Sequence, residues 1–291
     1  MSENTIMFPN LGITLPNVGK SVSIFGLEIA FYGITIAFGM LCGIWLLTKV
    51  AEKTGQDKDM YFDLSLITIV CSVVGARIYY VIFSWDDYKN DPAAIFNIRG
   101  GGLAIYGGVL AGVLTVWIFS VVRKQNFGRL ADTICTGLIL GQMIGRWGNF
   151  FNREVFGGYT DGLFAMALPQ EAVRSAGDIT SEMLAHSYAA DGVKFIQVHP
   201  TFLYESLWNA GVLAVLLYFT KKKKFHGEVF LLYLAGYGLG RFWIEGIRTD
   251  QLLLPGTGVP VSQVLSALLF VGALTVLFVG LKKQKKTETH M

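Results

Sequence analysis

The chain has 291 residues, of which 53% are hydrophobic and 15% charged, with 34 glycines and a formal net charge of +3. This composition excludes an ordinary soluble domain, because stretches of about twenty apolar residues, the length that spans a bilayer, recur along the chain. The short alternating segments of a transmembrane barrel are absent from the sequence. The chain is therefore predicted to be an all-α polytopic membrane protein.

The apolar stretches predict seven transmembrane helices, since lipid leaves no partner for an unpaired backbone amide. The predicted spans are 24–48, 61–83, 101–122, 130–151, 199–220, 228–247 and 261–281. The first span follows an acidic and polar stretch rather than a basic one, so it is not predicted to be a cleavable signal peptide. Residues 1–151 are thus expected to hold helices one to four, and residues 199–291 helices five to seven with a basic tail.

Residues 152–198 form the longest stretch between predicted spans, with six acidic and three basic residues and the apolar run from Leu163 to Leu168. Such a segment is too long to be a mere connection, and it shows little helical periodicity. It is predicted to be a small external cap.

The distribution of lysine and arginine predicts the orientation, because basic residues near span ends stay cytoplasmic. Fourteen of the 24 fall in one set of loops: Lys49, Lys53, Lys58, Arg123, Lys124, Arg129, Lys221 to Lys224, Lys282, Lys283, Lys285 and Lys286. The other side holds seven, spread over longer segments: Lys20, Lys89, Arg99, Arg153, Arg174, Lys194 and Arg248. The amino terminus is therefore expected outside and the carboxyl terminus in the cytoplasm, and the lysine runs are interpreted as topology signals rather than nucleic-acid patches.

Three arginines lie inside predicted spans: Arg77 in 61–83, Arg146 in 130–151 and Arg241 in 228–247. A cation in hydrocarbon is costly, so each is a functional-site hypothesis by default. In the predicted orientation all three lie toward the external face, and Arg146 is about 8 Å from the end of its helix. Three cations at one depth predict one anionic partner.

The densest group of glycine and polar residues surrounds Arg146. Gly141, Gly145 and Gly148 would form one smooth helix face that another backbone or a lipid can approach closely. The planar fork of Arg146 suits a phosphodiester, and Asn149 can add donors to its oxygens. The alternative is ordinary packing of small residues, with Arg146 reaching the interface or pairing with Glu154.

Simpler interpretations also exist for the other two arginines. Arg241 and Glu245 are one turn apart, so they can form an internal salt bridge. Arg77 can be a structural cation between helices. The three cysteines all fall within predicted spans without paired spacing and are interpreted as small apolar residues.

Residues 145–157, Gly-Arg-Trp-Gly-Asn-Phe-Phe-Asn-Arg-Glu-Val-Phe-Gly, resemble the signature of prolipoprotein diacylglyceryl transferases, which are bacterial inner-membrane enzymes. Further matches follow in the family's order: Tyr32-Gly33, Gly75-Ala-Arg77, Gly100 to Gly102 with Gly107-Gly108, His199-Pro200 with Leu203-Tyr204-Glu205, and Tyr237-Gly238 with Arg241, Glu245 and Arg248. The resemblance implies transfer of the diacylglyceryl group of phosphatidylglycerol to the lipobox cysteine of a prolipoprotein, with release of glycerol 1-phosphate. It implies no metal, no cofactor and no nucleic-acid partner, and it makes the cap the expected receiver of the peptide.

The resemblance also implies roles for individual residues. Arg146 and Arg241 are the principal functional arginines, Tyr32, Asn149 and Gly157 are important, and Tyr237 and Glu154 are supporting positions. In the implied reaction Arg146 would hold the headgroup phosphate and Arg241 would meet the charge that develops as it leaves. Glu245, Arg77 and His199 complete the predicted substrate-binding set.

Tyr106 departs from the family pattern, because many members carry a histidine at this position; Ala30 stands where some have another. A phenol with a pKa of about 10 is a poor base near neutral pH, so Tyr106 is expected to donate a hydrogen bond to phosphate or to position the lipid. An interfacial tyrosine is the alternative. The candidate acceptors of the thiol proton are Glu245, Glu154, His199 and the leaving phosphate, although His199 before Pro200 can simply begin a helix.

Two other classes of membrane protein fit the sequence less well. A transporter or channel would place polar residues through the whole membrane thickness and between repeated halves, whereas only a short Gly-Arg or Gly-Ala-Arg pattern recurs here. A seven-span receptor gives no reason for three arginines at the depth of lipid phosphates.

Overall fold

Helices dominate the computed structural model, which describes residues 1–97 and 101–289. Arg99, predicted to lie on the external side, and Gly100, part of the glycine match to the family, lie outside the described residues. The long helices within these ranges are α1 (Phe31–Lys53), α2 (Lys58–Phe83), α4 (Ile105–Val122), α5 (Phe127–Asn152), α7 (Thr201–Phe219), α8 (Glu228–Glu245) and α9 (Val261–Thr289). Short helical turns are α3 (Trp85–Tyr88), α6 (Ser181–Ala185), η1 (Pro9–Leu11), η2 (Pro92–Phe96), η3 (Gln170–Ala172) and η4 (Ala176–Asp178).

Five of the described helices are long and apolar enough to cross a membrane: α1, α2, α4, α7 and α9. This confirms a polytopic membrane protein. The two other long helices, α5 and α8, carry Arg146 and Arg241 together with more polar neighbours. The prediction that the chain crosses the membrane seven times, with α5 and α8 as two of the spans, stays a prediction.

The first helix begins later than predicted, because residues 21–30 form a hairpin of β3 (Ser21–Ile24) and β4 (Leu27–Ala30). Ile24 pairs with Leu27, and the turn between them places Phe25 and Gly26 at φ values of 51° and 79°. Positive φ at both central residues is what a two-residue hairpin turn of the primed type needs. The predicted start at residue 24 was therefore wrong, because a short apolar run does not distinguish a strand from a helix.

Glycines bring the backbones of α1 and α5 into direct contact along the middle of the bundle. A Cβ at Gly43 would lie 2.7 Å from the carbonyl oxygen of Gly137, and one at Gly39 would lie 3.1 Å from that of Gly141. Helix α5 also packs against α7 and α8, and α9 packs against α8. The arginine-bearing helix α5 is thus enclosed by α1, α7 and α8.

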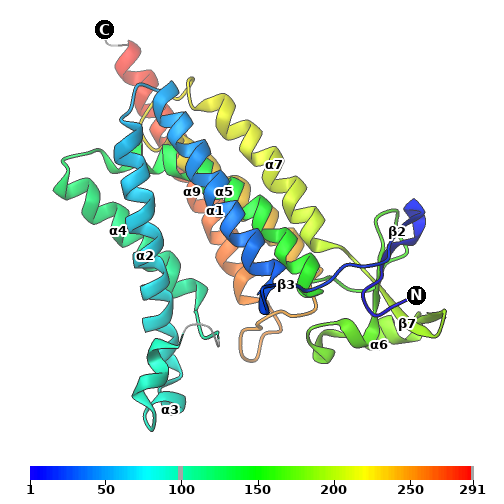
Figure 1. Cartoon of the computed structure of the whole chain (residues 1–291). Coiled ribbons are helices and arrows are strands. Elements are labelled where there is room, and N and C mark those ends of the chain that lie inside the picture. The colour runs from blue at the N-terminus through cyan, green and yellow to red at the C-terminus, as the bar shows by residue number, and fades with distance from the viewer. Residues whose placement is uncertain (98–100, 290–291) are drawn as a thin grey trace.

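Helices α2 and α4 form a pair that diverges from this bundle (Figure 1). They join it through a buried cluster near the end where the carboxyl terminus lies, which consists of Leu47, Ala51, Tyr61, Leu64, Val116 and Leu130. The pair is therefore fixed chiefly at the lysine-rich end, away from the cap.

The cap is a five-stranded antiparallel sheet rather than a helical element, so the prediction of an all-α chain is wrong here. Its strand order is β2-β1-β5-β7-β6. The strands are β1 (Ile6–Phe8), β2 (Ile13–Leu15), β5 (Met166–Pro169), β6 (Tyr188–Ala190) and β7 (Val193–Val198). Two of them come from residues 6–15, since Met7 pairs with Ala167. Strands this short, paired across most of the chain, leave no periodic pattern in the sequence.

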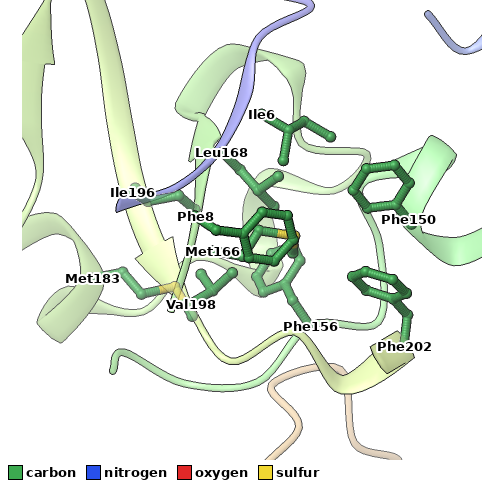
Figure 2. Close-up of a cluster of buried hydrophobic side chains, with 10 residues drawn as sticks. All are labelled: Ile6, Phe8, Phe150, Phe156, Met166, Leu168, Met183, Ile196, Val198 and Phe202. Atoms are coloured by element: carbon green, nitrogen blue, oxygen red, sulfur yellow. The ribbon is translucent and has the colours of Figure 1, made fainter. Parts of the chain in front are cut away.

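One hydrophobic core joins the cap to the helices (Figure 2). Phe150 of α5 and Phe202 of α7 pack with Phe156 of the following segment against side chains of the sheet and α6. The other members of this core are Ile6, Phe8, Met166, Leu168, Met183, Ile196 and Val198. The cap therefore fixes the ends of α5 and α7, the two helices that carry Arg146 and Glu205.

Candidate active site

A chain of ion pairs crosses three helices at the cap end of the bundle. Glu205 of α7 contacts Arg146 of α5, with Oε2 2.6 Å from Nε, and Arg241 of α8, with Oε1 3.0 Å from Nη1. Arg241 also contacts Glu245 one turn later, with Nη2 2.6 Å from Oε2. The glutamate side chains are 3% exposed, against 20% for Arg146 and 15% for Arg241. The arginine side chains are thus more exposed than the two carboxylates that they contact.

The network continues beyond α8 to Arg248 and Asp250. Arg248 lies 3.4 Å from Glu245 and donates to both oxygens of Asp250, at 2.9 and 2.6 Å. Burial alone would raise the pKa of Asp250, but the hydrogen bonds and charge of Arg248 lower it below its ordinary value. Three arginines therefore face three carboxylates, and the formal charges within the network cancel.

Hydrogen bonds between the helices hold this arrangement. The indole of Trp147 donates to the hydroxyl of Ser206 at 3.2 Å, and Ser206 donates to the carbonyl of Met143 at 3.0 Å, so α7 is tied to α5. The indole of Trp208 donates to the carbonyl of Gly236 at 2.8 Å, which ties α7 to α8. Because Ser206 and Trp208 lie close to Glu205 in the sequence, these contacts fix the carboxylate between the arginines.

Gly145 and Gly148, on either side of Arg146, pack against α1, as ordinary packing of small residues predicts, and Gly148 makes room for the ring of Tyr32. A Cβ at Gly145 would lie 3.2 Å from Ile36, and one at Gly148 would lie 2.8 Å from the ring of Tyr32. Tyr32 and Tyr237 are both close enough to interact electrostatically with Arg146. Two tyrosines predicted for the site are therefore beside Arg146.

Gly157 joins the segment after α5 to the start of α7 and the end of α8. The backbone amide of Gly157 donates to the carbonyl of His199, and the backbone amide of His199 donates to the carbonyl of Gly158, each at 3.0 Å. The backbone amide of Gly158 donates to the carbonyl of Ile247, also at 3.0 Å. A Cβ at Gly157 would lie 2.8 Å from both the Cβ of His199 and the carbonyl oxygen of Ile247. Only glycine fits this close approach of three segments.

His199 lies at the same junction, directly before α7. Its Nδ1 is 3.2 Å from the hydroxyl of Tyr204, and burial lowers the pKa of its imidazole below the ordinary value of 6.5. Burial therefore favours the neutral form of the ring. It makes no ion pair within the described part of the chain, so it borders the charged network without belonging to it.

A second polar cluster forms around Glu154, just after α5. Its Oε1 accepts hydrogen bonds from the side-chain amides of Asn149 at 2.9 Å and Asn152 at 3.2 Å, and its Oε2 lies 2.5 Å from the guanidinium group of Arg174. The alternative in which Arg146 pairs with Glu154 is thus wrong, since Arg146 pairs with Glu205. The amide of Asn149 is directed to Glu154 and stabilises the turn that follows Arg146.

Comparisons with known proteins show the family of this chain. Residues 20–279 match the family model of prolipoprotein diacylglyceryl transferase. The chain belongs to this family. It is 40% identical over 250 residues to the phosphatidylglycerol--prolipoprotein diacylglyceryl transferase of Clostridioides difficile, covering 86% of this chain and 90% of that protein. Proteins of the same name from Bacillus cereus and Bacillus mycoides are 39% and 42% identical, over 84% and 74% of this chain and 85% and 75% of their own lengths.

Arg77, the third arginine predicted for the site, lies outside the network. It is buried beside the ring of Tyr88, and all five of its N–H donors meet backbone carbonyls at 2.7–3.1 Å. The acceptors are Ala94, Ile95, Asn97, Gly101 and Gly102. The prediction of one anionic partner for three arginines was therefore wrong for Arg77, which holds the segment between α2 and α4.

Tyr106, which was expected to contact the lipid, is in the first turn of α4 and is 42% exposed. Its hydroxyl has no hydrogen-bond partner among the residues that the structure describes. Contact of Tyr106 with lipid phosphate stays a prediction.

Glu205 lies at the centre of the ion-pair network, although the sequence pattern predicted no role for it. It appeared only as part of the Leu-Tyr-Glu match at the start of the fifth predicted span. The available signal was electrostatic, because a carboxylate in an apolar segment is as costly as an arginine and needs a partner. Matching acids with arginines across different spans would have paired it with Arg146 and Arg241.

Proposed function

We propose that this protein transfers the sn-1,2-diacylglyceryl group of phosphatidylglycerol to the lipobox cysteine thiol of a prolipoprotein, forming a thioether and releasing glycerol 1-phosphate. The observation that carries this proposal is the pair of guanidinium groups from α5 and α8 that share one buried carboxylate at the cap end. The names of the relatives of this chain contain phosphatidylglycerol and prolipoprotein, which supports the same reaction.

The proposed setting is the bacterial inner membrane, crossed seven times, with the cap and the active site at the external leaflet. The five apolar helices support this topology, and α5 and α8, with 26 and 18 residues, are long enough to complete the seven. Lys221 to Lys224 and the basic tail lie at the end of the bundle opposite the cap, as the positive-inside rule requires.

The chemistry we propose begins with the phosphate of the lipid bound by Arg146, whose fork suits a phosphodiester. The cysteine sulfur attacks the glycerol carbon that bears the phosphate ester, the S–C bond forms and the C–O bond breaks. The electron pair goes to the phosphate oxygen, which gains negative charge as the diester becomes a monoester. Arg241 stabilises this developing charge, which is how an electrostatic site lowers the barrier more for the transition state than for the bound lipid.

The thiol must lose its proton during this attack. A cysteine thiol has an ordinary pKa of about 8.5, and nearby guanidinium groups lower it. Of the side chains considered as acceptors, Glu154 is occupied by Arg174 and two amides, and Glu245 lies between Arg241 and Arg248. His199 carries no ion pair within the described residues, and its imidazole contacts the hydroxyl of Tyr204, so among the three it is the group not already held by an arginine.

The remaining predicted site residues support these groups in the proposal. Tyr32 and Tyr237 position the guanidinium of Arg146, and Gly157 keeps the ends of α5, α7 and α8 in register. Asn149 and Glu154 stabilise the turn after α5, and the cap receives the peptide.

The test is a transfer assay with the purified protein, phosphatidylglycerol and a synthetic lipobox peptide, read by mass spectrometry. We expect the peptide to gain one diacylglyceryl group at its cysteine. Controls are a peptide with serine at that position and phosphatidylcholine in place of phosphatidylglycerol. If a folded preparation modifies no cysteine, the protein binds or moves lipid instead, and the proposed reaction is wrong.

A further inference from the structure

We infer that Glu205 is a positioning residue for the transfer reaction, which holds the two arginines in one arrangement and balances their charge before the lipid phosphate arrives. The inference rests on the proposed function and assigns a role to a residue of the same site. Glu205 is inferred to act through Arg146 and Arg241 rather than on the reacting atoms.

The first observation is that the two oxygens of Glu205 serve two different helices. Oε2 meets Arg146 of α5 at 2.6 Å, and Oε1 meets Arg241 of α8 at 3.0 Å. The carboxylate comes from α7, whose neighbouring side chains are hydrogen-bonded to both α5 and α8. A single buried group therefore sets the distance between the two guanidinium groups.

The second observation concerns which side of Arg146 is held. The closest approach of Glu205 is to Nε, at the stem side of the guanidinium group. Phosphate is bound bidentately by parallel N–H donors, and the terminal nitrogens can supply these. Glu205 thus holds the guanidinium group at its stem side, so the closest contact of the carboxylate does not use the terminal nitrogens.

The third observation is that the two arginines depend on Glu205 unequally. Among the described residues, Glu205 is the carboxylate within ion-pair distance of Arg146, whereas Arg241 also contacts Glu245. Removing the charge of Glu205 would leave Arg146 without an ion-pair partner while Arg241 stays held. The relative placement of the pair would be lost although both arginines remain.

These observations predict opposite effects on lipid binding and on turnover. Neutralising Glu205 changes the formal charge of the six-residue network from zero to +1, which favours an anionic phosphate. The same change releases Arg146 from its fixed orientation, and misplacement by about 1 Å costs about 100-fold in rate. Binding would therefore be kept or strengthened while the chemical step slows.

The experiment measures kcat and KM for phosphatidylglycerol in Glu205→Gln and Glu205→Asp, together with equilibrium binding of phosphatidylglycerol in mixed micelles. Glu228→Gln is the matched control, because Glu228 is similarly buried at the opposite end of α8, where it accepts a hydrogen bond from the amide of Lys224. We expect Glu205→Gln to lower kcat about 100-fold with KM unchanged or lower, Glu205→Asp to restore part of kcat, and Glu228→Gln to keep both parameters near wild type.

Two results would overturn the role of Glu205. One is a kcat of Glu205→Gln within threefold of wild type, and the other is phosphatidylglycerol binding at least tenfold weaker than wild type. The binding measurement decides even when turnover is absent, and Glu205→Asp keeps the charge if the glutamine variant does not fold. A wild-type protein that binds the lipid but transfers nothing would instead contradict the proposed function.

Discussion

Replacing Gly157 by alanine should damage the active site without touching any charged group. The added Cβ would lie 2.8 Å from the Cβ of His199 and from the carbonyl oxygen of Ile247, whereas ordinary contact begins at 3.4 Å. Both neighbours must retreat by about 0.6 Å, and neither is the flexible end of a side chain. The three hydrogen bonds that join the segment at 157–158 to His199 and Ile247 would be strained by this shift.

The expected magnitude follows from how closely this junction is connected to the network. Ile247 lies between Glu245, which is a partner of Arg241, and Arg248, which contacts Glu245, so its movement displaces part of the network around Arg241. Overpacking of this kind costs about 1–3 kcal/mol of stability. A shift of half to one ångström at catalytic groups lowers rates by about 10-fold to 100-fold, so we expect kcat to fall by at least tenfold.

The neighbouring variant Gly158→Ala is a matched control, because a Cβ at that position would meet nothing within 4 Å. Transfer of the diacylglyceryl group to a lipobox peptide is measured for both variants by mass spectrometry, and thermal unfolding midpoints are measured alongside. We expect Gly158→Ala to stay near wild type. Equal activities of the two variants would refute the close-approach argument for Gly157.

Three further predictions concern other parts of the fold. Arg77→Lys should destabilise the protein by about 1–3 kcal/mol, because an ammonium group cannot donate to all five backbone carbonyls that Arg77 contacts. The control substitution Arg123→Lys, at an exposed arginine, should leave the stability unchanged. Equal unfolding midpoints for the two variants would contradict the structural role of these five hydrogen bonds. Gly148→Ala should displace the ring of Tyr32, which would lie 2.8 Å from the new Cβ, and should lower kcat. The control substitution Gly211→Ala, where a Cβ meets nothing within 4 Å, should leave kcat unchanged. An unchanged kcat of Gly148→Ala would show that the reaction does not depend on the position of the Tyr32 ring. Arg248 lowers the pKa of Asp250 in the folded protein, so the Asp250 carboxylate should stabilise the fold above about pH 4, and this stabilisation should be lost as the pH falls through the lower folded pKa. The difference in unfolding midpoint between wild type and Asp250→Asn should therefore be constant from about pH 7 to about pH 5 and shrink below about pH 4. A difference that grows below about pH 4 would contradict this ion pair.

The sequence predicted the long helices well, because apolar length is a strong local signal. The predicted spans 61–83 and 228–247, for example, correspond to helices Lys58–Phe83 and Glu228–Glu245. The same local signal failed at residues 24–30, where an apolar run forms a hairpin strand. It also gave no indication that residues 6–15 would enter the sheet of the cap, because that pairing is made across most of the chain.

The candidate site was only partly predictable for a related reason. The cost of burying a cation identified Arg146 and Arg241, and the structure brings both to one carboxylate. The same rule selected Arg77, since a sequence does not tell whether a buried guanidinium meets an anion or a set of backbone carbonyls. Glu205 was missed because its role depends on the packing of α7 between α5 and α8, which no single segment encodes.

The most direct test of the central claim is the single-turnover rate of thioether formation in Arg146→Gln and Arg241→Gln, measured on folded protein with saturating phosphatidylglycerol. Glutamine keeps a polar side chain but removes the charge that is proposed to hold the phosphate and stabilise its departure. We expect each substitution to slow the transfer by at least about 100-fold, the effect of removing a preorganised electrostatic group. Transfer at the wild-type rate by either variant would contradict the account.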